Sequence, residues 1–303
     1  MDMAIDGGQT GLRVALAVRG QVREVRELAG LSYAEGSPVD AVLARVEVPE
    51  GVDTVCLGLT TLLDSPEVLA ARLLERARRV IVTTDVVTSH AGAFPAGAGV
   101  VLAAGTGAIA LGIPPAPRAS GAVQVDGWGF LFGDAGSGFW IGRHGLDAAY
   151  RGFDGRGPAG ALTARAREVF GDLATLPHRL YLGSDAVARI AGFAPHVCEL
   201  AAADAVAGEI VDSAATELAG TVAAAARHFP GEVPVAWTGR LLRDDRLRAG
   251  FESALADRLP MARIGPAAGD SLAGAARLAA AATDLGPYAG LVTVRALTAE
   301  AAR

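Results

Sequence analysis

The 303-residue sequence predicts an α/β fold, and three observations indicate this class. Short apolar segments of strand length alternate with longer segments of helical pattern. Glycine-rich turns follow several of the apolar segments, where a strand must reverse. Residues 3–17 and 100–112 repeat one arrangement: an apolar strand, a turn containing glycine and threonine, and a second apolar strand. The repeat suggests two hairpins, one per half, that could grip a polyphosphate.

The first part of the chain contains the clearer boundaries. Ser37-Pro38 and Ser65-Pro66 each place an N-cap before a proline at the first helical position, which predicts helices to about residue 46 and over 67–79. The turn Arg19-Gly20 leads into residues 21–28. Strands are predicted at residues 3–5, 13–18, 54–59, 80–84, 99–104 and 108–113.

The Pro-rich stretch 114–117 predicts a domain boundary, with one lobe over residues 1–115 and a second over 116–303. In the second lobe a glycine-rich segment, 127–138, leads into a helix through about residue 150. Helical patterns follow over 159–229, with breaks near Pro177, Gly183 and Pro195. The remaining expectations are a strand at 233–237, helices at 244–259 and 270–283, and a strand or coil at 289–297.

The composition excludes several mechanisms. All 27 basic residues other than histidine are arginine, and the chain contains neither lysine nor asparagine. Walker A loops, protein kinases and Schiff-base enzymes all need a lysine, so none of these applies. A net charge of −6 disfavours a nucleic-acid partner, which would need a basic surface.

The location of the chain is also suggested by its sequence. No apolar run approaches the ~18 residues of a membrane span, and the N-terminus has no basic segment typical of a secretory signal. Cys56 and Cys198 are isolated and suit reduced thiols, which excludes a cysteine zinc site. We therefore expect a cytoplasmic protein with no membrane partner.

The first candidate site is the sequence DGGQTG at residues 6–11. Glycines let backbone amides approach an anion, and a carboxylate at the strand end can hold a hydrated divalent cation. The alternative, an ordinary glycine-rich hairpin with a capping aspartate, is about equally good from these residues alone.

Two other turns have similar chemistry. Gly105-Thr106-Gly107 could cradle phosphate with its amides, and it is no dinucleotide fingerprint because a strand follows it instead of a helix. Thr238-Gly239 follows a strand and could let the backbone pass under a nucleotide. For each, a simple turn is the alternative.

Asp85 ends an apolar strand at residues 80–84. A carboxylate at such a strand end can take a proton from a substrate hydroxyl that attacks phosphorus. The alternative is that Asp85 only caps the following helix. The neighbouring His90 is given no role, and the histidines show no metal-binding spacing.

Residues 126–142 are the richest stretch, with many glycines around Trp128 and Trp140. Glycine costs about 0.5–1 kcal/mol relative to alanine in regular structure, so this density suggests a shaped binding loop. An aromatic plane beside a carboxylate suits a sugar. The alternative is a tight packing corner.

With these motifs in order, the chain resembles the N-acetylglucosamine kinase family, within the BadF/BadG/BcrA/BcrD ATPase group of the actin–hexokinase–Hsp70 superfamily. DGGQTG looks like the first phosphate loop, VVLAAGTG the second and VAWTG the adenosine loop, and GWGFLFGDAGSGFWIG is similar to the sugar-binding signature. The resemblance implies two ribonuclease-H-like (actin-like ATPase) lobes around a central nucleotide cleft. It implies an ATP- and Mg²⁺-dependent kinase of an amino sugar and leaves room for a homodimer.

The resemblance also implies residue roles. Asp85 matches the catalytic aspartate and Asp6 the acid that holds Mg²⁺ through water. The residues expected to bind ATP are Gly7, Gly8, Gln9, Thr10, Gly105, Thr106, Gly107, Thr238 and Gly239. Those expected to bind the sugar are Ser32, Asp85, Gly127, Trp128 and Asp134.

Some positions depart from the family pattern. Ala135 stands where the family has glutamate, Arg240 replaces the second glycine of the adenosine loop, and the lysine that often follows the first phosphate loop is missing. Residues 30–34 lack the asparagine that usually helps to hold the sugar. N-acetylglucosamine is the simplest substrate, followed by glucosamine or a muramyl-type sugar. The rival functions are a non-catalytic sugar sensor and, less favoured, a reductase-activating ATPase with a cluster shared by a dimer.

Overall fold

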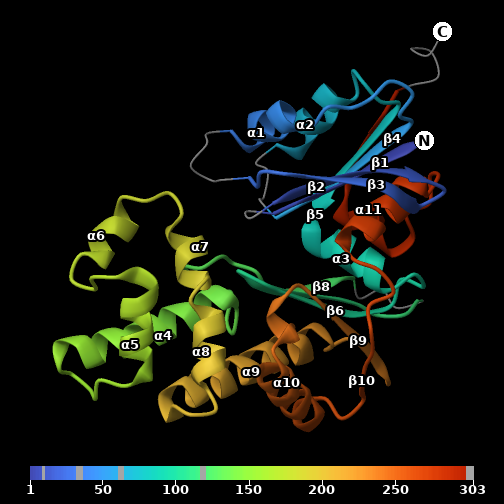
Figure 1. Cartoon of the computed structure of the whole chain (residues 1–303). Coiled ribbons are helices and arrows are strands. Elements are labelled where there is room, and N and C mark those ends of the chain that lie inside the picture. Colours follow the sequence, from blue (N-terminus) through green and yellow to red (C-terminus); the bar gives the residue numbers. More distant parts are fainter. Residues whose placement is uncertain (9–10, 32–36, 61–64, 117–120, 298–303) are drawn as a thin grey trace. The chain divides into compact units, whose positions relative to one another are not determined.

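A computed structural model of the chain describes residues 1–8, 11–31, 37–60, 65–116 and 121–297. The chain divides into two compact units. Unit 1 comprises Met1–Val101, Pro115–Pro117 and Pro266–Arg303, and unit 2 comprises Leu102–Pro114 and Arg118–Gly265. The predicted α/β class is confirmed, with two sheets and helices around them (Figure 1).

The sheet of unit 1 has six strands in the order β11-β5-β4-β1-β2-β3. The central strand β1 pairs antiparallel with β2 and parallel with β4, and β4 pairs parallel with β5. The strands of this unit are β1 (Asp2–Gly7), β2 (Leu12–Val18), β3 (Gln21–Leu28), β4 (Thr54–Leu59), β5 (Arg79–Thr84) and β11 (Thr293–Ala296).

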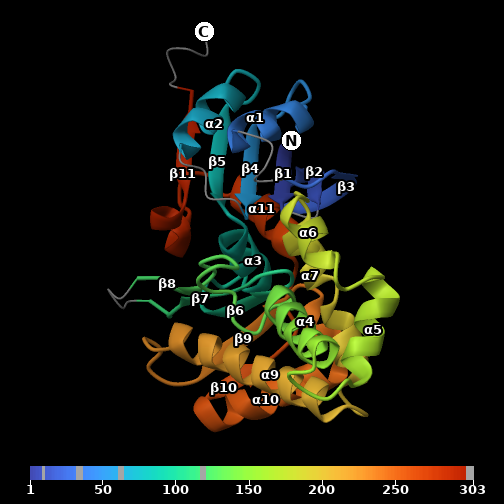
Figure 2. The same cartoon turned by 90° about the vertical axis from the view of Figure 1, so that its left-hand side faces the viewer.

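Helices cover both faces of this sheet (Figures 1 and 2). They are α1 (Pro38–Arg45), α2 (Pro66–Leu73), α3 (Asp85–Ala93) and α11 (Ser271–Ala280). Met3 and Ile5 belong to the core cluster that includes residues of α1 and α2. Because side chains alternate along a strand, Asp6 lies on the opposite face, where α11 contacts β1.

One predicted helix end in unit 1 is wrong, and one predicted N-cap makes no capping hydrogen bond. The helix predicted over 67–79 ends at Leu73, because Arg79 already pairs with Thr54 in the sheet and donates its N–H to the Asp53 carbonyl. Ser65 occupies the N-cap position of α2, but its side chain makes no capping hydrogen bond. Ser37, by contrast, accepts from the Asp40 N–H as the cap pattern predicts.

The division into units differs from the predicted boundary at residue 115. Residues 102–114 lie in unit 2, because β6 and β7 are strands of the second sheet. Residues 266–303 lie in unit 1, where β11 pairs antiparallel with β5 and α11 packs against β1. Strand pairing distant in sequence, rather than the Pro-rich stretch, decides which unit each segment joins.

The sheet of unit 2, which the chain enters along β6, has the order β10-β9-β6-β7-β8. Its strands are β6 (Gly99–Ala104), β7 (Ala108–Ile113), β8 (Val123–Asp126), β9 (Val233–Thr238) and β10 (Ala262–Ile264). The short strands β8 and β10 are absent from the sequence-based expectations. Residues 289–297 were expected to form a strand or coil. In the structure the 3₁₀ helix Gly286–Leu291 precedes the strand β11.

The helices of unit 2 are α4 (Gly138–Asp154), α5 (Ala161–Phe170), α6 (Leu176–Tyr181), α7 (Ala186–Ala191), α8 (Ala194–Leu200), α9 (Ala205–Ala225) and α10 (Asp245–Arg258). Pro177 and Pro195 stand in the first turns of α6 and α8, so they start helices. Helix α9 packs against β7, β8 and α10 (Figure 2). In the described part of the chain, no single helix has the length and apolarity to cross a membrane; one strongly bent helix pair, 186–200 with 205–225, passes that test on length and composition.

Candidate functional site

The first glycine-rich turn of unit 1 follows β1 and is held closely against its surroundings. A Cβ at Gly7 would lie 2.7 Å from the Leu59 side chain, so a larger residue there would displace that side chain. Gly8 donates its N–H to the Gly11 carbonyl over 2.9 Å and accepts from Leu31 over 3.0 Å. The predicted residues Gln9, Thr10 and Ser32 lie outside the described residues.

Asp6 and Arg13 face each other across the β1–β2 hairpin. Arg13 donates from Nε and Nη2 to the same oxygen, Oδ2 of Asp6, over 3.0 and 2.6 Å. Its Nη1 donates to Asp270 over 2.7 Å, and Nη2 also donates to the Ser271 hydroxyl over 3.0 Å. The arginine therefore links the predicted metal acid to the start of α11.

Asp85 is the first residue of α3, and Thr84, not Asp85, is the N-cap. Its Oδ2 lies 2.6 Å from the Thr60 hydroxyl, which is 3.1 Å from the Gly7 carbonyl oxygen. Thr60 also donates its backbone N–H to Gly7 over 2.8 Å. The structure thus connects the predicted base and the predicted phosphate loop through one threonine.

The electrostatic environment of Asp85 disfavours its charged form. Burial raises the pKa of Asp85 above its ordinary value, the hydrogen bond from Thr60 opposes that rise, and the negative charge of Asp6 adds to it. A carboxyl group with a raised pKa has an increased proton affinity, which suits a general base near neutral pH.

In unit 2, the turn Gly105-Thr106-Gly107 packs against the start of α4. The carbonyls of Gly105 and Thr106 accept from the N–H groups of Gly138 and Phe139 over 2.8 and 3.0 Å. The Gly105 N–H donates to the Gly107 carbonyl over 2.9 Å, so the groups that the turn can offer to a ligand are the amides of Thr106 and Gly107 and the Thr106 hydroxyl.

The predicted adenosine loop comes close to this turn. Gly239 has a φ of +95°, and a Cβ there would overlap the carbonyl oxygen of Ala104, the residue before Gly105. Thr238 ends β9, which neighbours β6 in the sheet. Strand pairing and the absence of a side chain therefore bring Thr238 and Gly239 next to the turn at residues 105–107.

Asp126, the last residue of β8, organises the loop at residues 127–137 that leads to α4 and is called the signature loop below. Its Oδ1 accepts from the N–H groups of Gly127 and Asp134 over 2.8 and 2.7 Å, and its Oδ2 accepts from Ala135 over 2.9 Å. Asp126 and Asp134 both have positive φ, 61° and 58°, which is uncommon outside glycine. The hydrogen bonds to Asp126 hold the loop in this conformation.

Asp134 lies against the turn at residues 105–107. Its Oδ1 accepts from the Ala108 N–H over 3.3 Å, and its carboxylate atoms lie 2.9–3.0 Å from where a Cβ of Gly107 would be. Burial raises the pKa of Asp134, the Ala108 N–H opposes the rise, and the charge of Asp126 adds to it. The structure thus brings Asp134 together with Gly107.

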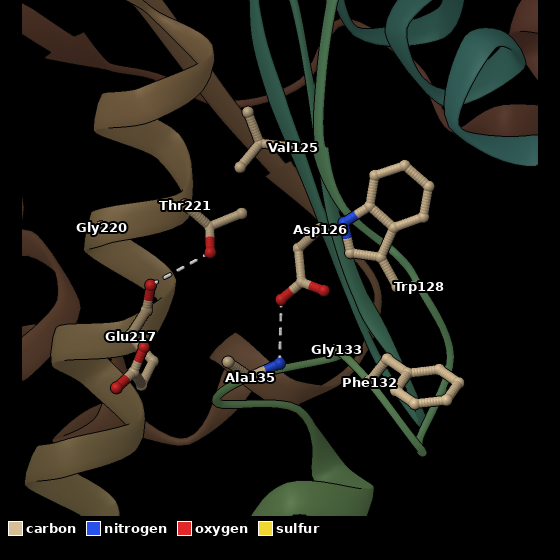
Figure 3. A pocket seen from close by; sticks show the side chains of 9 residues that line it. All are labelled: Val125, Asp126, Trp128, Phe132, Gly133, Ala135, Glu217, Gly220 and Thr221. Atoms are coloured by element: carbon tan, nitrogen blue, oxygen red, sulfur yellow. Dashed lines mark hydrogen bonds between the residues drawn. The ribbon is translucent and has the colours of Figure 1, made fainter.

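Trp128 lines a separate cavity of about 350 Å³ between the signature loop and α9 (Figure 3). The side chain of Trp128 is 67% exposed and that of Phe132 is 86% exposed. Figure 3 shows both rings across the cavity from Glu217 and Thr221 of α9. The cavity is lined by Val125, Asp126, Trp128, Phe132, Gly133, Ala135, Glu217, Gly220 and Thr221. Predicted residue Gly127, with φ +76°, packs under this loop on Ile109.

The residues of unit 1 fit a magnesium ion held mainly by a nucleotide. Mg²⁺ prefers oxygen ligands and is often bound by one or two carboxylates together with substrate phosphates and water. Within the described ranges no group of three or more His, Cys, Asp or Glu residues is placed to hold a metal. Oδ2 of Asp6 is occupied by Arg13, and Oδ1 receives no hydrogen bond from the described residues. A single carboxylate oxygen acting through water matches the predicted role of Asp6.

His90 and the two cysteines lie outside these sites. His90 is fully buried and bonds Tyr288 through Nδ1 over 2.9 Å and the Gly99 carbonyl through Nε2 over 3.0 Å. Burial raises the pKa of the Cys56 and Cys198 thiols to about 12, so neither is a ready thiolate ligand.

No sequence pattern singled out Thr60, Arg13 or Asp126 as functional residues. Arg13 could have been predicted from the hairpin pattern. Asp6 is the second residue before the turn at residues 8–11 and Arg13 is the second residue after it, so the two pair across the strands. Asp126 could have been found as a carboxylate before a Gly-rich loop, where aspartate often accepts from backbone N–H groups. Thr60 and Asp270 reach the site only through tertiary packing.

The chain is similar to several known proteins. A family model described as the BadF/BadG/BcrA/BcrD ATPase family matches residues 6–274. The structure of a candidate N-acetylglucosamine kinase from Chromobacterium violaceum is 25% identical, with a TM-score of 0.74, and the match covers 91% of this chain and 97% of that one. A second candidate N-acetylglucosamine kinase, from Porphyromonas gingivalis, is 17% identical, with a TM-score of 0.71, over 91% and 98% of the two chains. These structures have the predicted fold class.

A curated relative matches over a shorter range. The N-acetylmuramic acid/N-acetylglucosamine kinase of Clostridium acetobutylicum is 35% identical over 79 residues. The match spans 26% of this chain and 25% of that relative, about a quarter of either protein.

Proposed function

The chain belongs to the BadF/BadG/BcrA/BcrD ATPase family, and on this premise we propose that it is an ATP-dependent kinase that phosphorylates a hydroxyl group of an amino sugar. N-acetylglucosamine is the simplest substrate. The Chromobacterium violaceum structure supports this substrate class, because its similarity to this protein extends over nearly the whole of both chains. The shorter match to the Clostridium acetobutylicum kinase also supports it. Glucosamine and muramyl-type sugars are the next candidates.

The observation that carries the proposal is the connection between Asp85 and the first phosphate loop. Thr60 contacts both Asp85 and the Gly7 carbonyl, so the base and the loop are fixed relative to each other within unit 1. Burial raises the pKa of Asp85, which favours proton abstraction from a sugar hydroxyl.

In the proposed reaction, Asp85 takes the hydroxyl proton as the sugar oxygen attacks the γ-phosphorus of ATP. The new bond joins the sugar oxygen to phosphorus, the bond from phosphorus to the β–γ bridging oxygen breaks, and ADP leaves with the bonding electron pair. Backbone amides of Thr106 and Gly107 bind phosphate oxygens, whereas the N–H of Gly8 is already donated to the Gly11 carbonyl. Mg²⁺, when bound, neutralises negative charge on the phosphates. This arrangement needs no lysine, because amide groups and the cation supply the positive potential.

Trp128 and the signature loop supply the proposed sugar contacts. The indole face of Trp128 is available for the C–H face of a sugar ring, since most of the side chain is exposed. Asp134 contributes a carboxylate acceptor close to Gly107. The proposal includes a cytoplasmic location. It also includes a homodimer, which sedimentation velocity would detect.

The test is a coupled ADP-release assay with ATP, Mg²⁺ and a panel of N-acetylglucosamine, glucosamine, N-acetylmuramic acid, N-acetylmannosamine and glucose. We expect turnover with at least one amino sugar and loss of about 10²–10⁴-fold in Asp85→Asn. Asp257→Asn, which changes an exposed aspartate on α10, is the matched control and should retain activity.

Two results would replace this function. Sugar binding by calorimetry without ADP release from any member of the panel would identify a non-catalytic sensor. ATP hydrolysis that no sugar stimulates would point instead to an ATPase that activates a reductase.

A further inference from the structure

The first phosphate loop of this lysine-free chain has one arginine beside it, and the hairpin register explains why. Asp6 and Arg13 are directly paired residues of antiparallel strands, so their side chains lie on the same face of the sheet. That face is the one that α11 contacts, away from the core that contains Met3 and Ile5.

The hydrogen bonds of Arg13 are distributed unevenly over Asp6. Nε and Nη2 both reach Oδ2, whereas a usual bidentate pair would bind each carboxylate oxygen once. This leaves Oδ1 of Asp6 without a hydrogen bond from the described residues. The carboxylate is therefore fixed by one oxygen and offers the other.

Arg13 is itself held from a distant part of the sequence. Asp270 is the N-cap of α11: its Oδ1 accepts from the Ala273 N–H over 3.0 Å, and its Oδ2 accepts from Arg13 over 2.7 Å. Ser271 adds a hydroxyl acceptor over 3.0 Å. The Asp6 side chain is 18% exposed and that of Arg13 is 33% exposed, so the cluster is partly shielded from water.

From this geometry we propose that Arg13 is a positioning residue for Asp6, and that Asp270 holds Arg13 in turn, so that Oδ1 of Asp6 is fixed toward the hydrated cation that accompanies the nucleotide. Because Asp6 meets a cation only in the proposed kinase reaction, this inference rests on the proposed function. A purely structural link between the hairpin and α11 is the alternative reading of the same contacts.

Four variants separate these readings. Arg13→Met removes the charge and all donors, and Arg13→Lys keeps the charge without the planar guanidinium. Asp270→Asn keeps a good helix cap and weakens only the bond to Arg13. Arg23→Met is the control, because Arg23 is an exposed residue of β3 whose side chain, among the described residues, hydrogen-bonds Gln21 alone, two positions away.

The affinity of each variant for ADP is measured by calorimetry, once in excess Mg²⁺ and once in EDTA. Thermal unfolding checks that each variant folds. Groups that orient a metal-associated ligand typically change metal affinity by about 10- to 100-fold when removed. We expect Arg13→Met to reduce ADP affinity about tenfold or more in Mg²⁺ but little in EDTA. Arg13→Lys and Asp270→Asn should cause a smaller loss of ADP affinity in Mg²⁺. Arg23→Met should bind ADP as the wild type does.

The outcomes are distinct. If folded Arg13→Met and Asp270→Asn bind ADP as the wild type does in both conditions, or lose affinity equally in both, Arg13 does not position a metal acid and the inference is overturned. If the wild type binds no ADP in either condition, the proposed function itself fails and this inference fails with it.

Discussion

Thr60 donates its hydroxyl hydrogen to Asp85, with 2.6 Å between Oγ1 and Oδ2, and the same hydroxyl lies 3.1 Å from the Gly7 carbonyl oxygen. A hydroxyl has one hydrogen and can donate to one of these acceptors at a time. When Asp85 is ionised, Thr60 donates to it. When Asp85 carries the proton, it can donate to Thr60, which then donates to Gly7. The contact can therefore accommodate both protonation states of a general base.

Removing this donor should change the pH dependence of catalysis. The Thr60 hydrogen bond lowers the pKa of Asp85, against the dominant effect of burial. In Thr60→Val the pKa of Asp85 should rise further, so more of the base is protonated at a given pH. We expect the acidic limb of kcat/KM for the sugar to move to higher pH. Thr60→Ser, which retains the hydroxyl, should keep the wild-type limb; an unchanged limb in the valine variant would contradict the role of Thr60.

Asp85 should reduce the stability of unit 1 at neutral pH. Its pKa in the folded state is raised, chiefly by burial, so folding favours the protonated form. The stability that this proton provides is present below the ordinary carboxyl pKa and is lost as pH rises through the raised value. Asp85→Asn should therefore increase the free energy of unfolding at pH 7, and the increase should shrink in acid. Urea titrations at several pH values measure it, and an equal gain at every pH would exclude the carboxyl charge as the cause.

Local sequence patterns predicted the inner strands well and the packing between distant segments poorly. The strand predicted at 54–59 has the same bounds in the structure, because turn residues flank a continuous apolar run. The helix predicted to residue 79 was too long, because its pattern continues past Leu73 while backbone bonds to Asp53 draw the chain into β5. The return of residues 266–297 to unit 1 depends on β11 pairing with β5, which no local signal encodes.

The same contrast holds for the candidate site. Chemical type and position at a strand end were enough to select Asp6 and Asp85. Their partners Thr60 and Asp270 come from segments far apart in the sequence, so they required the sheet order and the placement of α11. Asp126 lay inside the glycine-rich stretch, but its three backbone hydrogen bonds become evident only once the loop has folded.

His90 should make unit 1 sensitive to acid. Burial lowers the pKa of His90 from 6.5 to about 4, so the folded state keeps the ring neutral. Between pH 6.5 and 4 the unfolded chain binds a proton that the folded chain does not, and stability is lost as pH falls, by about 3 kcal/mol at most. We expect His90→Gln, which can still bond Tyr288 and Gly99, to show a flatter fall of unfolding free energy over this range. Parallel curves for both proteins would contradict the assignment.

The contact between α3 and α11 depends on Gly274. A Cβ there would overlap the Thr88 carbonyl oxygen and lie 2.6 Å from the Gly92 nitrogen. Gly274→Ala should therefore force the helices apart and reduce the free energy of unfolding by about 1–3 kcal/mol or more. Gly220→Ala is the matched control, because no atom lies within 4 Å of its Cβ position on α9. That change should stabilise by up to about 1 kcal/mol through helix propensity. Chemical denaturation measures both, and a neutral Gly274→Ala would contradict the close approach.

Asp126 should control sugar affinity without touching the first phosphate loop. Asp126→Gly tolerates the positive φ at this position but removes the acceptors for the N–H groups of Gly127, Asp134 and Ala135. The signature loop then loses its fixed shape, and misplacing substrate contacts by about 1 Å can cost up to 10²-fold. We expect KM for the sugar to rise about tenfold or more, with ADP affinity changed much less, and Asp126→Asn to lie between this variant and the wild type. Steady-state kinetics and calorimetry measure the two effects separately. An unchanged sugar KM in Asp126→Gly would show that the loop does not shape the sugar site.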